Sequence, residues 1–364
     1  MSAIRRASMR RGLRSVLIGA ALCVILPPSP GWARVLYTSP GLILSSTSTS
    51  SRIAWAAQLN RPGPLFRVYR RRAFTGAPIP LQRAQILARS VPWVRLVGAR
   101  AYWDETDAGN TLRADDVFST VRMGRPSSVG DFTVFCGFNG CNPNTTGKQL
   151  GPVAIGDGAL TYSVFAVAID GGGNATITGG VVRRAIVSPS GAVTHRLVPG
   201  APGAALLAQS GRNLLEAPAA PPVGTTVKPG STIQLRDDRT GALRWAATTP
   251  GTVTALGISG LYACALVKPP IGAPRIVAYT TASGAVAHTL PLRSPVLAVL
   301  GVSGPRVVFE HPRGIVLWNV RHNLVRRLQR TQRVPRDLTF AGRLVTWNTG
   351  RSKILGILLP PVRH

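Results

Sequence analysis

The sequence is short of acidic residues, lysine and histidine, and these shortages limit the chemistry that it can support. Its 364 residues include 13 Asp or Glu and 5 His, against 43 Lys or Arg. The histidines show no metal-binding spacing, and no GxSxG sequence or phosphate-cradling loop occurs. Acid–base catalysis needs positioned carboxylates or imidazoles, so this composition favours a binding protein over an enzyme.

The positive charge is carried almost entirely by arginine, with 39 Arg and only 4 Lys. Both residues contact phosphate, so this ratio indicates a GC-rich bacterial genome more than a binding chemistry. A net charge of +30 would still attract polyanions such as nucleic acid, anionic lipid or wall polymers. The arginines are scattered, and they do not alternate with aromatics as in a nucleic-acid platform, which makes nucleic acid the least expected polyanion.

The N-terminus predicts a secretory signal peptide over residues 1–33. A basic segment precedes 11 apolar residues at 16–26, prolines follow, and Gly31-Trp32-Ala33 provides small residues around a cleavage position. Eleven apolar residues are too few to cross a bilayer, which takes about 20. We expect a secreted or cell-envelope protein, exported by the general or the twin-arginine route, with no transmembrane segment after cleavage.

Cysteine is scarce as well, since the chain has only four. Cys136 and Cys141 enclose a short Gly-containing loop, which in an exported protein predicts a disulfide, here within a loop insertion at 124–151. Metal binding is the alternative, but no His or second Cys pair stands nearby. Cys264 lies in a predicted strand and is expected to be a buried free thiol.

Helical periodicity is absent from the mature chain, which consists instead of repeats. Segments 233–266, 276–310 and 315–348 align with a single one-residue gap. Each has a turn followed two positions later by an apolar residue, and these apolar residues are Leu243, Val286 and Val325. A second turn of the repeat can be traced through seven copies, at Ser50, Gly98, Gly158, Gly211, Gly260, Gly304 and Gly342.

Four short strands fit into each copy, and seven four-stranded units without helices predict an all-β, seven-bladed β-propeller over residues 34–364. The last unit lacks its fourth strand, whereas Val35–Thr38 is a strand without a unit. We therefore expect the N-terminal strand to complete the last blade and close the ring. An irregular pair of β-sandwiches is the alternative.

One hairpin carries the pattern Asp237, Thr240, Gly241 and Trp245. In this hairpin the chain resembles the repeats of quinoprotein-like propellers, and over 34–364 it is similar to WD-repeat-like propellers in general. The resemblance implies that Asp237 and Gly241 shape a turn and that Trp245 packs between blades. The quinone pocket and acidic metal site of those enzymes have no counterpart, so the resemblance implies no cofactor and no catalytic residue.

The acids are unevenly distributed, and five of the 13 lie within a 13-residue span. They are weak candidates for a cation site or for paired carboxylates: Asp104, Glu105, Asp107, Asp115 and Asp116. Their spacing matches no calcium loop, which favours a solvated loop between strands.

Together these features predict a monomeric, non-enzymatic binding or scaffold module of the cell envelope, with a protein or polymer as its ligand. The alternative is a hydrolase, lyase or oxidoreductase with its site at the central channel. Fold alone cannot choose between them. Converging acids, His or Arg in the channel would favour an enzyme, and an apolar plug would favour a scaffold.

Overall fold

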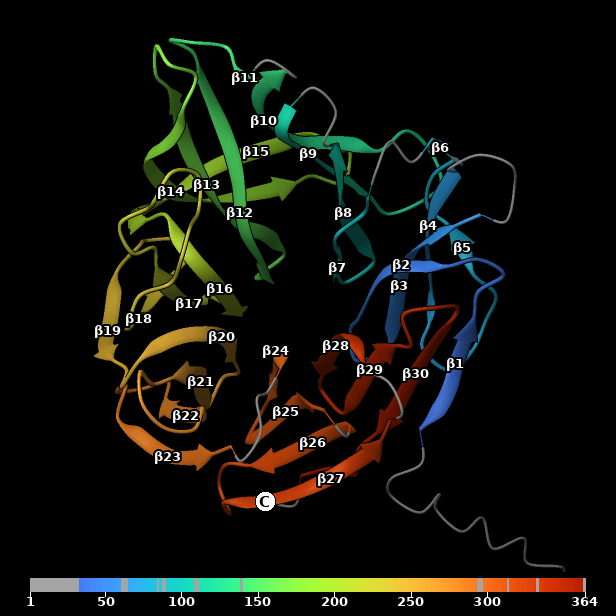
Figure 1. Cartoon of the computed structure of the whole chain (residues 1–364). Coiled ribbons are helices and arrows are strands. Elements are labelled where there is room, and N and C mark those ends of the chain that lie inside the picture. Colours follow the sequence, from blue (N-terminus) through green and yellow to red (C-terminus); the bar gives the residue numbers. More distant parts are fainter. Residues whose placement is uncertain are drawn as a thin grey trace, which may run out of the picture.

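The computed structural model describes residues 33–362 except 60–64, 84, 87–89, 108–110, 138–139, 293–296, 313 and 332–333. In this part of the chain the regular elements are thirty strands, which form seven antiparallel sheets. Figure 1 shows these sheets as blades around a common axis, in chain order. The predicted seven-bladed β-propeller is confirmed, and the sandwich alternative is wrong. None of the described segments is a helix long and apolar enough to cross a membrane.

The first three blades differ in strand length, and each runs from its innermost strand outward. Blade 1 consists of β2 (Ile43–Ser48), β3 (Arg52–Gln58), β4 (Leu65–Arg72) and β5 (Ile79–Pro80), and β6 (Gln85–Ile86) also pairs with β4. Blade 2 consists of β7 (Val94–Val97), β8 (Arg100–Asp107), β9 (Thr111–Thr120), β10 (Ser127–Gly137) and β11 (Gly140–Cys141). Blade 3 consists of β12 (Thr146–Gly156), β13 (Ala159–Ile169), β14 (Ala175–Val187) and β15 (Val193–Pro202).

The other four blades have more even strand lengths. Blade 4 consists of β16 (Ala204–Ser210), β17 (Asn213–Pro218), β18 (Thr232–Asp237) and β19 (Leu243–Thr248). Blade 5 consists of β20 (Thr252–Ile258), β21 (Tyr262–Lys268), β22 (Arg275–Thr280) and β23 (Val286–Pro291). Blade 6 consists of β24 (Leu297–Ser303), β25 (Arg306–His311), β26 (Gly314–Asn319) and β27 (Leu324–Arg330). Blade 7 consists of β28 (Arg336–Ala341), β29 (Leu344–Asn348), β30 (Lys353–Leu358) and β1 (Arg34–Thr38).

The core lies between blades rather than inside one sheet. The second strand of each blade is covered on both faces by neighbouring blades, so it becomes a nearly continuous buried run, as in β3 and β29. Large aromatic side chains fill these joints. Trp55 packs with Leu344 across the joint of blades 7 and 1, and Trp103 packs with Phe66 across the joint of blades 1 and 2.

The ring is closed by the N-terminal strand, as predicted. β1 pairs antiparallel with β30, with Arg34 opposite Gly356 and Thr38 opposite Lys353. Leu36 of β1 is buried against Ile354 and against Ile43 of blade 1. Blade 7 thus combines strands from both ends of the described chain. Their pairing holds the ring closed.

Blades 2 and 3 differ from the rest because their strands are long. The segment 124–151, expected to be a loop insertion, is mostly strand, since β10 and the start of β12 run through it. Its two cysteines face each other in register, with Cys136 opposite Cys141 at the end of β10 and β11. The side chain of Cys136 lies outside the described residues, and the disulfide stays a prediction. Cys264 is buried and free, as predicted.

Candidate functional site

A pocket of about 520 Å³ lies between β10 of blade 2 and the broad face of blade 3. Its size is that of a small-molecule site, since such pockets usually measure about 300–1,000 Å³. The lining comes from five strands: Val129 to Phe132 of β10, Lys148 of β12, Tyr162, Val164 and Ala166 of β13, Gly179 to Val181 and Arg183 of β14, and His195 of β15.

Strand periodicity places these side chains on one face of blade 3. Tyr162, Val164 and Ala166 alternate along β13 and therefore point to the same side. Their cross-strand partners on β14 are Arg183, Val181 and Gly179, in that order, and Lys148 of β12 lies opposite Ala166. The three side chains of β13 thus form a row along the pocket wall. Lys148 of β12 stands beside one end of this row, and Arg183 of β14 stands beside the other end.

Two adjacent glycines of β14 line the pocket, and only one of them has space for a side chain. A Cβ at Gly180 would lie 2.5 Å from Cδ1 of Phe165, so no larger residue fits there. A Cβ at Gly179 would have no atom within 4 Å. A larger side chain introduced at Gly179 would therefore fill part of the pocket without a clash.

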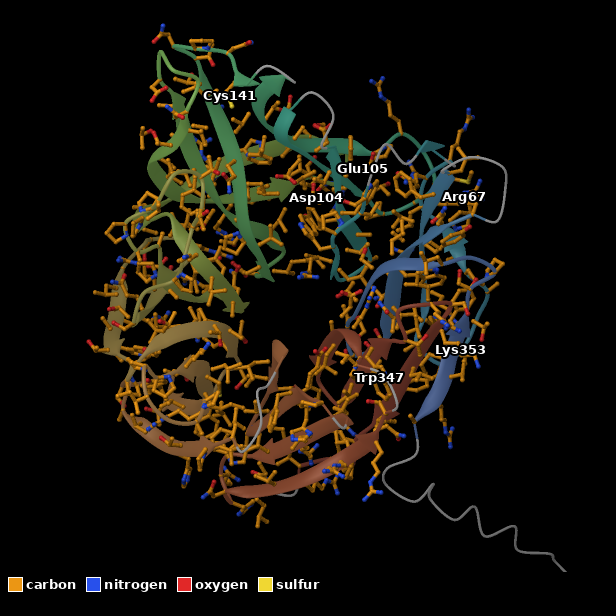
Figure 2. All side chains as sticks on the ribbon, in the orientation of Figure 1. Arg67, Asp104, Glu105, Cys141, Trp347 and Lys353 are labelled. Carbon is orange, nitrogen blue, oxygen red and sulfur yellow. The ribbon has the colours of Figure 1, made fainter. Side chains whose placement is uncertain are left out.

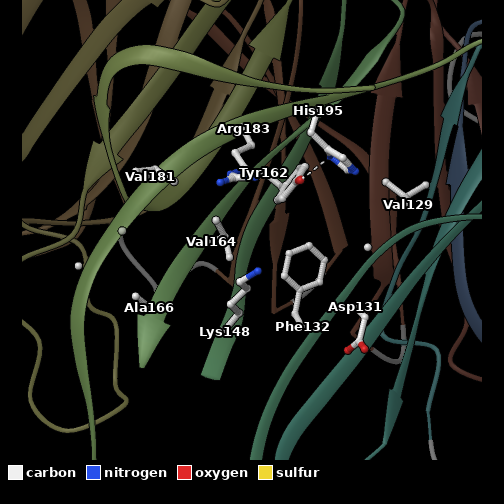
Figure 3. Close-up of a pocket in the computed structure, with 13 residues that line it drawn as sticks. Val129, Asp131, Phe132, Lys148, Tyr162, Val164, Ala166, Val181, Arg183 and His195 are labelled. Carbon is white, nitrogen blue, oxygen red and sulfur yellow. Dashed lines mark hydrogen bonds between the residues drawn. The ribbon is translucent and has the colours of Figure 1, made fainter. Parts of the chain in front are cut away.

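The rings of Tyr162 and Phe132 are buried side chains of the pocket lining, and the exposed His195 stands beside them (Figure 3). The hydroxyl of Tyr162 is hydrogen-bonded to Nδ1 of His195 at 2.9 Å, and the Tyr162 ring meets the edge of Phe132 with centroids 5.5 Å apart. Burial raises the pKa of Tyr162 and lowers the pKa of His195, and the neighbouring Arg183 adds to the lowering for His195. Both side chains are thus neutral at pH 7, and the floor of the pocket carries no charge.

Charge is confined to the rim. Lys148, Arg183 and Asp131 are all exposed, and Figure 3 shows Lys148 and Arg183 beside Val164 and Asp131 on the far side of Phe132. Asp131 already accepts a hydrogen bond of 2.5 Å from Oγ1 of Thr133. The rim therefore presents two cations and one partly engaged carboxylate around an apolar floor.

A second cavity, of about 470 Å³, occupies the central channel and is lined by the innermost strands of all seven blades. Its wall is mixed: apolar residues such as Leu256, Leu300 and Phe340 contribute somewhat less of the exposed surface than polar atoms do. Arg95 and Asp337 also line it. Asp337 accepts hydrogen bonds from the backbone N–H of Ser46 (2.8 Å) and from Nδ2 of Asn348 (2.7 Å). The channel therefore has a mixed wall and a polar end.

Glu310 of β25 lies close to this polar end. The residue is 4% exposed, and its Oε1 has no hydrogen-bond partner among the described residues. Burial and the nearby Asp337 raise the pKa of Glu310 to about 7, although the backbone N–H of Leu338 opposes the shift.

The five acidic candidates from the sequence lie in strands and not in a loop. Figure 2 shows Asp104 and Glu105 together on blade 2. Glu105 lies opposite Asp116, and Thr106 lies opposite Asp115, so the carboxylates divide between the two faces of β8 and β9. Asp104 and Asp115 are buried, and Oγ1 of Thr106 donates a hydrogen bond of 3.0 Å to Asp115. Among the described residues no three His, Cys, Asp or Glu side chains gather closely enough to hold a metal ion.

The Asp237 hairpin lies at the joint of blades 3, 4 and 5. Asp237 accepts backbone hydrogen bonds from Arg239 and Thr240, both 3.1 Å, and Gly241 adopts a φ of +73°. Burial would raise the pKa of Asp237, but these N–H groups and the Arg212 and Arg244 guanidiniums outweigh it and hold the pKa below its usual range.

Trp245 of the same hairpin reaches the next blade. Its Nε1 donates a hydrogen bond of 3.0 Å to the carbonyl oxygen of Thr281, and its ring lies where a Cβ of Gly284 would be, at 2.7 Å from Cδ2. Contacts of this kind hold blades together and offer no surface to a ligand.

The pocket residues had no signature in the sequence. Phe132, Tyr162 and His195 are far apart along the chain, and Phe132 lies in the segment that was expected to be a loop insertion. His195 and His288 shared a position in the repeat, and of the two His195 lines the pocket. The one available signal was the unusual length of blade 3. The repeat turn at Gly158 follows the turn at Gly98 by 60 residues and precedes the turn at Gly211 by 53 residues.

No protein-family model matches the sequence, and a search of the curated proteins finds no significant match. Solved structures are similar in fold. A chain from the mitotic checkpoint complex has a TM-score of 0.54 at 13% identity, covering 98% of this chain and 100% of its own. The computationally designed protein Ika8 has a TM-score of 0.51 at 14% identity, covering 90% and 100%.

BamB from Moraxella catarrhalis also matches, with a TM-score of 0.46 at 11% identity, covering 87% of this chain and 85% of its own. At such identities these likenesses concern the fold alone. By its own sheet order the chain is a seven-bladed β-propeller.

Proposed function

We propose that the protein is an exported, non-enzymatic binding module of the cell envelope whose ligand occupies the pocket between blades 2 and 3. The observation that carries the proposal is the pocket itself, an uncharged aromatic floor within a rim that has two cations. A ligand with an apolar body and an acidic group matches both parts, because the body buries apolar area and the acid lies near Lys148 and Arg183.

Binding of 8-anilinonaphthalene-1-sulfonate tests this proposal, because the dye combines an aromatic body with an anionic group. We expect the wild type to enhance the dye fluorescence saturably, Gly179→Phe to abolish the enhancement, and Lys148→Gln to weaken binding about tenfold. Gly260→Phe is the matched control, since a Cβ at Gly260 also meets no atom within 4 Å. Equal dye binding by wild type and Gly179→Phe would reject the pocket as the site.

Export rests on the predicted signal peptide and has its own test. We expect the protein recovered from the envelope or medium of an expressing bacterium to begin at Arg34, as measured by N-terminal sequencing. A cytoplasmic protein that still carries Met1 would contradict export and would leave the pocket unaffected.

An enzyme at the central channel is the second candidate, and one observation favours it. A general base works best with a pKa near the operating pH, and the pKa of Glu310 is raised to about 7 near Asp337, which lines the channel together with Arg95. If the channel is catalytic, Glu310→Gln should abolish turnover in a screen of hydrolase, lyase and oxidoreductase substrates. A binding module predicts no turnover by the wild type.

A further inference from the structure

The two faces of the ring differ in which connections they carry. Because the strands of a blade are antiparallel, the turn between its first and second strands and the turn between its third and fourth strands lie at the same edge. We call the side of the ring formed by these edges the turn face. The connections between second and third strands, and those between blades, lie on the opposite face.

Exposed apolar residues recur on the turn face, around most of the ring. Leu243, Val286 and Val325 share one repeat position, immediately after the turn to the outermost strand, and the structure exposes them by 50%, 59% and 49%. An apolar residue that recurs at a solvent-exposed position is not explained by core packing. Blades 1, 2 and 7 present similar side chains at the corresponding edge, namely Phe74, Met123 and Leu358, and blade 6 has a second one, Leu324.

Arginines stand next to these apolar residues. Arg72 precedes Phe74, Arg122 and Arg125 flank Met123, and Arg321 and Arg326 flank Leu324, all of them exposed. The acids of these turns are Asp157, Asp237 and Asp238, and each is paired with an arginine in blades 3 and 4. Along the described turns of the other blades the positive charge has no acidic neighbour in the same turn.

This combination fits a lipid surface better than a soluble polymer. Phosphate or carboxylate groups of either would pair with the arginines, but protruding apolar side chains gain free energy only where they can leave water. The turns of all blades lie on the same face of the ring, so a flat surface can contact several blades at once. The weak contacts of the single blades then add up through multivalency.

We propose that the turn face is a docking surface for an anionic lipid bilayer. The apolar side chains of the turns enter the headgroup region, and the arginines beside them pair with lipid phosphates. This surface uses none of the residues that line the pocket between blades 2 and 3, so either proposal can fail without the other.

Co-sedimentation with vesicles tests the docking surface. The full chain is mixed with vesicles of phosphatidylcholine alone or with added phosphatidylglycerol, and we expect binding only to the anionic vesicles. Each arginine near such a surface contributes about 1 kcal/mol, so the combined variant Arg72→Gln, Arg122→Gln, Arg125→Gln and Arg321→Gln should lower partitioning at least about a hundredfold. The combined variant Phe74→Ser, Met123→Ser, Leu243→Ser and Leu324→Ser should lower it about tenfold or more.

The matched control changes exposed residues of the opposite face, as Leu42→Ser, Ile271→Ser, Val334→Ser and Arg351→Gln. It should bind vesicles as the wild type does. All proteins carry the same residues 1–33, and the series is repeated with a chain that begins at Arg34 and retains every described strand. Circular dichroism spectra and unfolding midpoints confirm that the variants are folded.

Two results would overturn the proposal. One is an equal loss of vesicle binding in the opposite-face control, which would show that the turn face is not special. The other is binding to soluble heparin or DNA as tight as binding to vesicles, with no effect of the four apolar substitutions, which would identify a soluble polyanion as the partner.

Discussion

Blade 3 meets blade 4 through charges and blade 2 through an apolar hollow. At the first joint Nε of Arg184 lies 2.9 Å from Asp238, Arg239 pairs with Asp157, and Nε2 of Gln209 donates a hydrogen bond of 2.7 Å to Asp238. At the second joint Phe132 and Tyr162 contact each other edge to face, and the pocket lies beside them between β10 and blade 3. The charged joint is filled and the apolar joint is hollow.

The difference follows from what each kind of joint costs when it is incomplete. A buried charge without its partner costs several kcal/mol, so an ionic joint must close around matched groups. An apolar wall beside a cavity loses only dispersion contacts, and a ligand that enters the cavity restores part of these contacts. A ligand pocket is therefore better placed at the joint with blade 2, and substitutions at the two joints should have different effects.

The largest effect is expected from Asp238→Ala at the charged joint. Asp238 is fully buried and Arg184 is 6% exposed, so the substitution leaves a buried guanidinium without its main partner. We expect a loss of about 3–5 kcal/mol in the free energy of unfolding, measured in urea. The control Arg239→Gln removes only the pair with Asp157, in which Arg239 is 54% exposed, and should leave the free energy of unfolding nearly unchanged. Equal losses in the two variants would show that burial of the pair does not matter.

Glu310 tests whether a buried carboxylate that has no guanidinium partner among the described residues behaves differently. Its pKa of about 7 in the fold exceeds the ordinary 4.5, so the folded state binds the extra proton and is favoured below pH 4.5. This contribution is lost as the pH rises through 7, and it should amount to about 3 kcal/mol. Unfolding midpoints of wild type and Glu310→Gln, compared from pH 4 to 8, should diverge with rising pH in favour of the variant. Parallel curves would contradict it.

The blade 2 side of the pocket should be reinforced by a disulfide. Cys136 and Cys141 lie opposite each other in register, and Figure 2 shows Cys141 at the periphery of the molecule. Mass spectrometry of the exported protein should find these two cysteines linked and Cys264 reduced, and reduction should cost about 2 kcal/mol of stability. Burial raises the pKa of Cys264, so this thiol should react with iodoacetamide only after unfolding. A bond that includes Cys264 would refute the pairing.

The smallest effects come from a pair of glycines, one at each joint. A Cβ at Gly156 would lie 2.5 Å from Cγ of Gln209 in blade 4, whereas a Cβ at Gly179 meets no atom within 4 Å. Gly156→Ala should therefore cost about 1–3 kcal/mol through overpacking. Gly179→Ala should be neutral or stabilise by up to about 1 kcal/mol, because it restricts the unfolded chain. Thermal unfolding measures both, and a greater loss for Gly179→Ala would mean that the pocket joint is the tighter one.

Sequence reasoning was most successful where the signal was repeated. The turns at Gly260, Gly304 and Gly342 each introduce a second strand, and the unassigned strand at Val35–Thr38 could only complete the last blade. It failed for the segment 124–151, because Gly and Thr residues that indicate a loop are part of long strands in the fold. Pairing with β9 and β13 overrides these local preferences.

The sequence by itself determined the number of blades and the way the ring closes, because these depend on local spacing that recurs along the chain, and the resemblance to propeller repeats indicated the role of the Asp237 hairpin. Only the tertiary structure decided which side chains meet across blades. Tyr162 and His195 form a hydrogen bond, and Glu310 approaches Asp337, although nothing in their neighbouring residues indicates it. Such contacts depend on the register and curvature of whole sheets, and a repeat pattern records the strands but not how their faces are brought together.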